Sequence, residues 1–352
     1  MVGSDGVLPL PWLARAMHDG LRREGHAFLV HGPEGVGQFE LALSLAQGWL
    51  CEAAIPASVD PRPCGTCASC RLVQSRSHPD LLVLLPEVLR EALGWAVAGD
   101  AEEGGTSKAK PSKEIKVEAV RGAVTFAQTT SARGRGKVVV LHPAERINAI
   151  ASNTLLKTLE EPPGVARFLL SASHLDALLP TIRSRCQSIP LPLPPAAESA
   201  AWLRSEGVDD PETLLAACGG QPLLARQWAR EGVEARVWSR LPTLVRDGEA
   251  AAFLTWPLPR LIDALQKLCH DALSLAAGAA PRYFSAAELP KGASIGALTG
   301  WSKSLARIAA NAEHPWIAGL LVETLVEEAS CALETKPSGG PSSRAPSLHS
   351  RP

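Results

Sequence analysis

The sequence predicts an α/β fold in which a parallel sheet carries helices on both faces, followed by a second, mostly helical part. Strand-like and helix-like segments alternate from the N-terminus to Pro190. The strand-like runs are rich in Val and Leu and are bounded by Gly or Pro, which is typical of the buried strands of a parallel sheet. Beyond Pro190 the chain becomes rich in Ala and Leu, with the spacing of amphipathic helices.

The elements of the first part follow from these patterns in order. A short apolar run ends at a glycine in "HAFLVHG", and a helical pattern begins at Gln38. The helix that contains "TLEEPPG" is stopped by Pro162 and Pro163, because proline cannot continue a helix. We expect strands at 26–32, 80–86, 136–143, 166–173 and 187–191, and helices at 38–51, 114–131 and 148–164. Residues 98–113 are polar and low in complexity, which predicts an exposed loop.

Changes of composition divide the chain into predicted domains. The Pro-rich run "PLPLPP" ends an α/β domain, and the last residues have the composition of a disordered tail. We predict an α/β domain over 1–192, a small helical domain over 193–234, a larger helical domain over 235–334 and a tail over 335–352.

Charge and apolar content exclude some classes of protein. The 35 basic and 36 acidic residues give a net charge of -1, so the chain as a whole does not bind nucleic acid by its charge, although a local basic face is possible. No apolar run is long enough to cross a bilayer, and the first residues lack the pattern of a secretion signal. We therefore expect a cytoplasmic protein whose eight cysteines are thiols or metal ligands rather than disulfides.

The glycines after the first strand have the spacing of a phosphate-binding loop. Gly32 and Gly37 match the pattern G-x-x-x-x-G-K-[ST], but Gln38 and Phe39 stand where the lysine and the hydroxyl belong. Gln38 is neutral and Phe39 has no oxygen for magnesium. A tight strand-to-helix turn without any ligand explains the glycines equally well. In either interpretation we expect no ATP binding as a cofactor and no hydrolysis.

The run "GKVVVLHPAE" tests the same question independently. In a P-loop NTPase a second buried strand ends in an acid that holds the metal ion. Here the strand ends in His142 and Pro143, and the nearest acid is Glu145. The sequence therefore departs from a nucleotide site in two places, the phosphate-binding loop and the end of the second buried strand.

Four cysteines carry the strongest chemical signal. Cys64, Cys67 and Cys70 form C-x-x-C-x-x-C, and Cys51 lies upstream. Four thiolates at this spacing satisfy tetrahedral Zn²⁺ and leave no open position for water, so the site is structural. An iron–sulfur cluster or free thiols are the alternatives, but Gln74 stands where a ferredoxin has its next cysteine. We expect the remaining cysteines to be small buried residues, namely Cys186, Cys218, Cys269 and Cys331.

Two arginines lie in "PTIRSRCQ" before the last predicted strand. Arg183 and Arg185 are either ordinary surface residues or a means of contacting phosphate on a neighbouring molecule.

Together these pieces resemble the clamp-loader branch of the AAA+ ATPases. The residues that carry the resemblance are "NTLLKTLEEPP" at 153–163, "RFLLSAS" at 167–173 and "PTIRSRCQ" at 180–187, which contains Ser184, Arg185 and Cys186. A four-cysteine zinc module after the P-loop helix is also typical of the bacterial members. The resemblance implies an AAA+ core with a degenerate P-loop, a helical lid and a helical collar used for oligomerisation.

The resemblance also implies roles for particular residues. Arg185 falls on the arginine finger that reaches the ATP site of an adjacent subunit. Leu223 falls where motor subunits place a phosphate-sensing arginine, and Arg226 is displaced from it, so we assign no sensor. The metal ligands of the bacterial members match Cys51, Cys64, Cys67 and Cys70.

The implied function is that of a non-hydrolysing stator in the DNA polymerase III clamp loader. Its partners would be the gamma or tau motor subunits and the delta subunit in a heteropentameric ring, with the sliding clamp and primed DNA engaged by the whole complex. That complex is a nucleotidyltransferase holoenzyme used in DNA replication, although the chain alone is expected to lack ATPase activity. The alternatives are a diverged but active motor subunit and a zinc-dependent DNA-binding module.

Overall fold

The computed structural model describes residues 1–53, 63–95, 111–311 and 318–334. The chain forms two compact units, which we call the first and the second unit. The first unit comprises Met1–Ser205 with Gln221–Leu224, and the second comprises Glu206–Gly220 with Ala225–Pro352. The domain boundaries predicted at 192 and 234 would divide the chain more finely than these two units, and they remain predictions. The predicted exposed loop and tail fall almost entirely outside the described residues.

The first unit contains a five-stranded sheet in the order β2-β3-β4-β1-β5. Every neighbouring pair of strands is parallel, as the alternation of strands and helices predicted. The strands are β1 (Ala27–His31), β2 (Leu81–Leu84), β3 (Lys137–Leu141), β4 (Ala166–Ala172) and β5 (Gln187–Pro190). Because all strands run the same way, the segments that follow them meet at one edge and those that precede them at the other.

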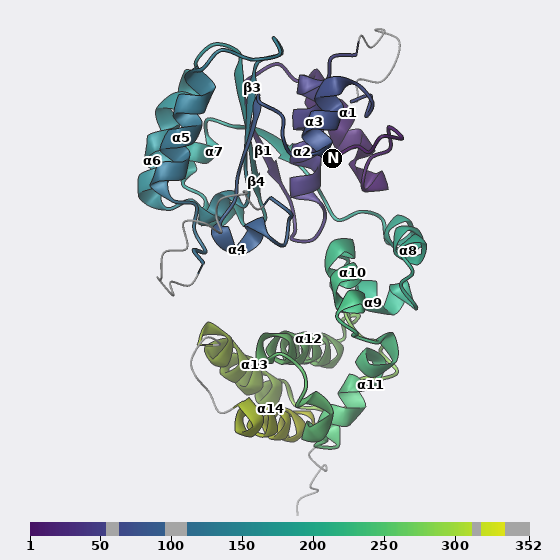
Figure 1. The fold of residues 1–352 in the computed structure, drawn as a ribbon. Coiled ribbons are helices and arrows are strands. Elements are labelled where there is room, and N and C mark those ends of the chain that lie inside the picture. Colours follow the sequence, from purple (N-terminus) through teal and green to yellow (C-terminus); the bar gives the residue numbers. More distant parts are fainter. Residues whose placement is uncertain (54–62, 96–110, 312–317, 335–352) are drawn as a thin grey trace, which may run out of the picture. The chain divides into compact units, whose positions relative to one another are not determined.

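Helices cover both faces of this sheet. Figure 1 shows α5 and α6 on one face and α1, α2 and α3 on the other. The helices of the first unit are α1 (Ala14–Arg22), α2 (Gln38–Leu50), α3 (Ala68–Gln74), α4 (Glu87–Arg90), α5 (Val117–Gln128), α6 (Ala149–Glu160), α7 (Pro180–Arg183) and α8 (Ala196–Ser205). Phe168 and Val139 of the sheet pack with Leu155 of α6 in one buried apolar cluster. The central strands are therefore buried on both sides, which explains their unbroken apolar sequence.

The described part of the second unit is helical throughout. Its helices are α9 (Pro211–Ala217), α10 (Pro222–Arg230), of which the first turn belongs to the first unit, α11 (Ala235–Arg246), α12 (Leu258–Ala276), α13 (Ile295–Ala310) and α14 (Ala318–Leu333). Short 3₁₀ helices occur in both units, at η1 (Pro11–Leu13), η2 (Ala144–Arg146), η3 (Leu175–Ala177) and η4 (Ala250–Phe253). Trp238 is buried at the centre and stacks on Phe284, with ring centroids 4.8 Å apart.

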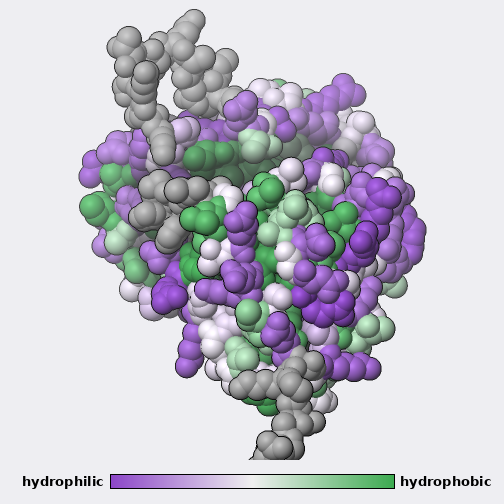
Figure 2. All heavy atoms as spheres, turned by 90° about the horizontal axis from the view of Figure 1, so that it is seen from below, coloured by the Kyte–Doolittle hydropathy of each residue, from purple (hydrophilic) through white to green (hydrophobic). Residues whose placement is uncertain are grey.

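The surface of the molecule mixes apolar and charged side chains. On the face drawn in Figure 2, apolar residues in green lie among polar and charged ones in purple. The large apolar side chains exposed in the second unit come from different helices, with Ile295 on α13 and Leu320 on α14. Within the described residues no helix is long and apolar enough to cross a bilayer.

Candidate functional site

The loop between β1 and α2 is shaped by close backbone packing. A Cβ atom on Gly32 would lie 1.9 Å from the carbonyl oxygen of Leu191, which follows β5. Gly37 directly precedes α2 and has a φ of 101°, and a Cβ atom there would lie 2.4 Å from Cδ1 of Leu10. Both positions thus require glycine because main chain or neighbouring side chains occupy the space.

The side chain of Gln38 is hydrogen-bonded to the backbone of this loop. Its side chain is 5% exposed, and its amide nitrogen donates to the carbonyl oxygens of Gly32 at 2.7 Å and Pro33 at 2.6 Å. A longer contact of 3.4 Å reaches the hydroxyl of Ser173. The residue in the lysine position therefore binds the loop itself and contributes no positive charge.

An aromatic pair stands where a nucleotide site would hold magnesium. Phe39 is 6% exposed and stacks on the ring of His142 at a centroid distance of 4.7 Å. His142 shares a hydrogen bond of 2.9 Å with the hydroxyl of Ser171, and burial lowers its pKa to about 4. The imidazole is therefore neutral near pH 7, and a neutral aromatic pair does not suit a hard cation.

The nearest acid is bonded to the backbone through one of its two oxygens. Oε1 of Glu145 accepts a hydrogen bond from the backbone N–H of Ser173 at 3.0 Å, while Oε2 is buried without a hydrogen-bond partner in the described structure. Among the described residues, the one cluster of at least three potential metal-ligating side chains is formed by cysteines elsewhere. The region around Gln38 therefore lacks the lysine and the hydroxyl of a P-loop, and Glu145 is its nearest acid.

The four predicted metal ligands come together. The ligand atoms of Cys51, Cys64, Cys67 and Cys70 all lie within 4.8 Å of one another. The Sγ atom of Cys51 is 3.6 Å from that of Cys64 and 3.8 Å from that of Cys67. Sulfurs held about 2.3 Å from one Zn²⁺ in a tetrahedron lie about 3.8 Å apart, so the spacing fits zinc. The residues present therefore fit a closed, structural metal site.

Backbone N–H groups support negative charge on this cluster. The N–H of Cys67 points at the sulfur of Cys64 with an N···S distance of 3.2 Å. Burial opposes ionisation of Cys64, but the N–H groups of Cys67 and Thr66 outweigh it and lower the pKa of the thiol to about 6. Burial instead raises the pKa of the Cys51 and Cys70 thiols. Metal binding requires thiolates, so a bound cation would have to offset the cost of ionising these two residues.

The N-terminal residues and a later loop hold the cysteine cluster against the sheet. Gln74 donates to the carbonyl oxygens of Val2 at 3.1 Å and Gly65 at 2.8 Å. Arg133, in the loop before β3, donates to Glu52 at 2.6 Å. The cluster is therefore part of the packing of the first unit.

A buried aspartate organises the same loop. The carboxylate of Asp80 is fully buried and pairs with Lys137 at 3.0 Å. It also accepts hydrogen bonds from the backbone N–H groups of Ala132 at 2.8 Å and Arg133 at 2.9 Å. Burial opposes its charge, but these donors outweigh it and lower the pKa of Asp80.

The structure separates the two predicted arginines. Arg185 lies in the turn between α7 and β5, where its Nε donates to an Oε of Glu160 at 2.6 Å. Arg183 is exposed and makes no such contact. Sequence reasoning had no signal for the partner, because Glu160 lies at the end of a different helix.

Two further expectations are resolved in the described residues. The backbone N–H of Leu223 donates to the carbonyl oxygen of Gly35 at 3.0 Å, while Arg226 pairs with Glu206 at 3.1 Å. Cys218 and Cys269 are buried as predicted. The prediction is wrong for Cys331, which is exposed because it lies on the solvent side of α14, and incomplete for Cys186, which is half-buried.

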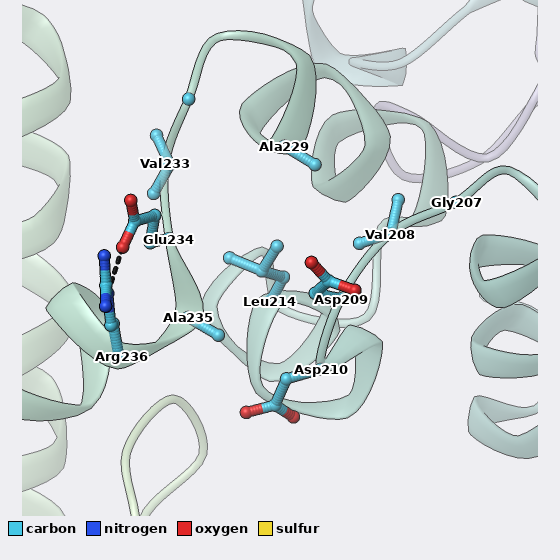
Figure 3. A pocket seen from close by; sticks show the side chains of 11 residues that line it. Gly207, Val208, Asp209, Asp210, Leu214, Ala229, Val233, Glu234, Ala235 and Arg236 are labelled. Carbon is cyan, nitrogen blue, oxygen red and sulfur yellow. Dashed lines mark hydrogen bonds and ion pairs between the residues drawn. The ribbon is translucent and has the colours of Figure 1, made fainter.

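A hollow of about 540 Å³ lies in the second unit between the start of α9 and the turn into α11. Figure 3 shows Val208, Leu214 and Val233 around it. The carboxylates of Asp209 and Glu234 also line it, and Glu234 is paired with Arg236. The acidic groups would repel a phosphate, so this hollow does not replace the closed loop as a nucleotide site.

The chain is similar in sequence to several known proteins. Residues 13–195 match the family described as DNA polymerase III, delta subunit. The chain is 38% identical over 256 residues to DNA polymerase III subunit delta' of Pseudomonas aeruginosa, which covers 69% of this chain and 70% of that protein. It is 31% identical over 354 residues to subunit delta' of Yersinia pestis, which covers 93% and 94%. Subunit tau of Escherichia coli is 34% identical over 186 residues, which covers 53% of this chain and 24% of that protein.

The family match spans nearly all of the first unit, and the delta' relatives align over most of the chain. The parallel sheet with its glycine loop and the helical part that follows it agree with the AAA+ fold that the sequence predicted. The chain therefore belongs to the delta' subunit family of DNA polymerase III.

Proposed function

We propose that this chain is a stationary, non-hydrolysing subunit of the DNA polymerase III clamp loader that supplies Arg185 in trans to the ATP site of a neighbouring motor subunit. The observation that carries the proposal is the position of Arg185 in the parallel sheet. Phe28 of β1 pairs with Gln187 of β5, so Arg185 lies at the edge where the strands begin. Gly32 and the loop lie at the opposite edge, where β1 ends.

This separation excludes a role for Arg185 at its own loop. At a rise of about 3.3 Å per residue, the part of β1 between the level of Gln187 and Gly32 is about 13 Å long, and Arg185 lies before Gln187. That length exceeds the reach of one side chain. An arginine that meets a phosphate from this edge must therefore meet it on another subunit.

The chemistry of the two edges is complementary. At the loop, Gln38 binds the backbone and the ring pair of Phe39 and His142 takes the place of metal ligands. At the other edge, Arg185 offers a planar guanidinium, which stabilises the charge that develops on a transferring phosphoryl group. A subunit that contributes only this group needs a rigid platform and no ATP of its own.

The partners in this proposal are the gamma or tau motor subunits and the delta subunit in a cytoplasmic ring. The tau relative and the delta' relatives support a place in that assembly. Opening the sliding clamp and placing it on primed DNA would be a property of the ring. The metal site would keep the first unit folded, with Zn²⁺ held by the four cysteines.

The test is reconstitution of the ring with Arg185→Ala. We expect normal assembly and a loss of the ATP turnover stimulated by clamp and DNA, because fingers in trans contribute on the order of 10³-fold or more at their own site. Arg183→Ala is the matched control, since Arg183 is an exposed arginine at the end of α7, two residues before Arg185. Unchanged turnover with Arg185→Ala would refute the finger. Turnover by the isolated chain would instead support the diverged motor subunit.

A further inference from the structure

Glu160 and Arg185 meet although they lie on separate elements. Glu160 is the last residue of α6, and Arg185 follows α7. Nε of Arg185 donates to Oε1 of Glu160 at 2.6 Å, and Nη2 contacts the same oxygen. Nη1 donates to the carbonyl oxygen of Thr181 at 2.9 Å and reaches the hydroxyl of Ser184 at the long distance of 3.5 Å. The guanidinium is thus held by Glu160 along the edge formed by Nε and Nη2, and by Thr181 at Nη1.

These contacts leave a particular part of the guanidinium unused. Arginine has five N–H groups in a planar fork. Glu160 takes the edge formed by Nε and Nη2, and Thr181 takes one N–H of Nη1. At the end of the fork, one N–H of Nη2 has no hydrogen-bond partner among the described residues, and the second N–H of Nη1 has only the long contact with the Ser184 hydroxyl. We call these two N–H groups the outer fork, and such a pair matches two oxygens of a phosphate.

The sequence around Glu160 fixes its position. Pro162 and Pro163 stop α6 directly after it, so Glu160 lies on the last turn. A carboxylate is electrostatically unfavourable at the C-terminus of a helix, so this glutamate does not serve the helix itself. The side chains of Arg185 and Glu160 are 30% and 48% exposed, and a surface ion pair of this kind adds little to stability.

We propose that Glu160 is a positioning residue for Arg185, holding the guanidinium so that its outer fork points away from the domain. The proposal rests on the proposed function, in which Arg185 acts on the ATP of a neighbouring subunit. A long arginine side chain in solvent samples many rotamers, and few of them place the fork correctly. Glu160 and Thr181 select one orientation before the subunits meet, which is the advantage of a preorganised charge.

The pair makes a prediction about kinetics that a structural ion pair does not. A finger acts on charge that develops in the transition state, so loss of its orientation lowers kcat and leaves the KM for ATP nearly unchanged. Glutamine at position 160 keeps an oxygen that accepts from Nε, whereas alanine removes it. Turnover should therefore depend on the acceptor oxygen more than on the negative charge.

The experiment uses the reconstituted ring with Glu160→Ala, Glu160→Gln and the double variant of Glu160→Ala with Arg185→Ala. Glu161→Ala is the matched control, because Glu161 is the exposed neighbour and, among the described residues, its side chain forms no hydrogen bond or ion pair with the guanidinium. We expect Glu160→Ala to cause most of the kcat loss seen with Arg185→Ala, and Glu160→Gln to retain most of the activity. The double variant should be no slower than Arg185→Ala alone, because both changes remove one interaction.

The outcomes separate this proposal from the proposed function. If Arg185→Ala has no effect, the finger itself is refuted. If Arg185→Ala is slow while Glu160→Ala matches the wild type, the finger stands and the positioning role is refuted. Faster turnover with Glu160→Ala would show that Glu160 restrains the arginine, which also overturns the proposal. Thermal unfolding of each variant identifies a loss of activity that comes from misfolding.

Discussion

The buried imidazole of His142 should make the first unit less stable in mild acid. Burial lowers its pKa from 6.5 to about 4. Between these values the unfolded chain binds a proton that the folded chain does not, so stability is full above pH 6.5 and falls as the pH decreases. One pKa unit corresponds to about 1.4 kcal/mol, and the linkage gives a loss of about 2 kcal/mol on going from pH 7.5 to pH 5.

The assay compares the wild type with His142→Phe in urea unfolding at pH 7.5 and pH 5. Phenylalanine keeps an aromatic ring against Phe39 and cannot titrate, so the free energy of unfolding of this variant should lack the contribution of about 2 kcal/mol. Cysteines and carboxylates titrate in both proteins and cancel in the difference. The same substitution at the exposed His174 is the matched control for an added aromatic ring.

An NMR titration of the ring protons gives the pKa of His142 directly. A value near 6.5 would refute the reasoning, because the ring would then be solvated like a free histidine. The same would follow if the wild type and His142→Phe lost equal stability between the two pH values.

Three further predictions concern the packing of the first unit. Gln38→Ala leaves two loop carbonyls without their donor and should lower the free energy of unfolding by about 1–3 kcal/mol in urea, and an equally stable variant would show that water replaces the amide. Asp80→Ala leaves Lys137 buried without its partner and should lower the free energy of unfolding by about 3–5 kcal/mol, whereas a small loss would mean that the lysine escapes to solvent. Chelation of the metal, or Cys70→Ser, should lower the melting temperature of the first unit and the zinc content measured by mass spectrometry, because a closed thiolate site is coupled to folding. Equal melting with and without metal would contradict a structural role.

The strands could be predicted from sequence because their boundaries carry their own signals. The run "GKVVVLHP" predicted a strand over 136–143, and β3 spans Lys137–Leu141 between the same glycine and proline. The helix before Pro162 ends at Glu160 for the same reason. In contrast, α1 was not predicted, and it buries one large side chain, Met17.

The candidate sites divide in the same way. The spacing of Cys64, Cys67 and Cys70 predicted the metal cluster because the ligands lie within one short segment. The contact between Glu160 and Arg185 could not be predicted, because it depends on how α6 and α7 pack. Local patterns reveal groups that act together within a few residues, whereas partners from distant segments require the fold.

The crowding at Gly32 has a consequence for how glycine-rich sequences are interpreted. The carbonyl of Leu191 leaves no room for a side chain there, so an alanine would clash with the backbone just after β5 whether or not the loop binds an anion. A glycine in such a loop can therefore be required by close packing between neighbouring strands alone, and the same glycine would be needed in a loop that binds no ligand. The positions that distinguish a ligand-binding loop are the two that follow, and in this chain they hold Gln38, which is hydrogen-bonded to the loop backbone, and Phe39, which stacks on His142.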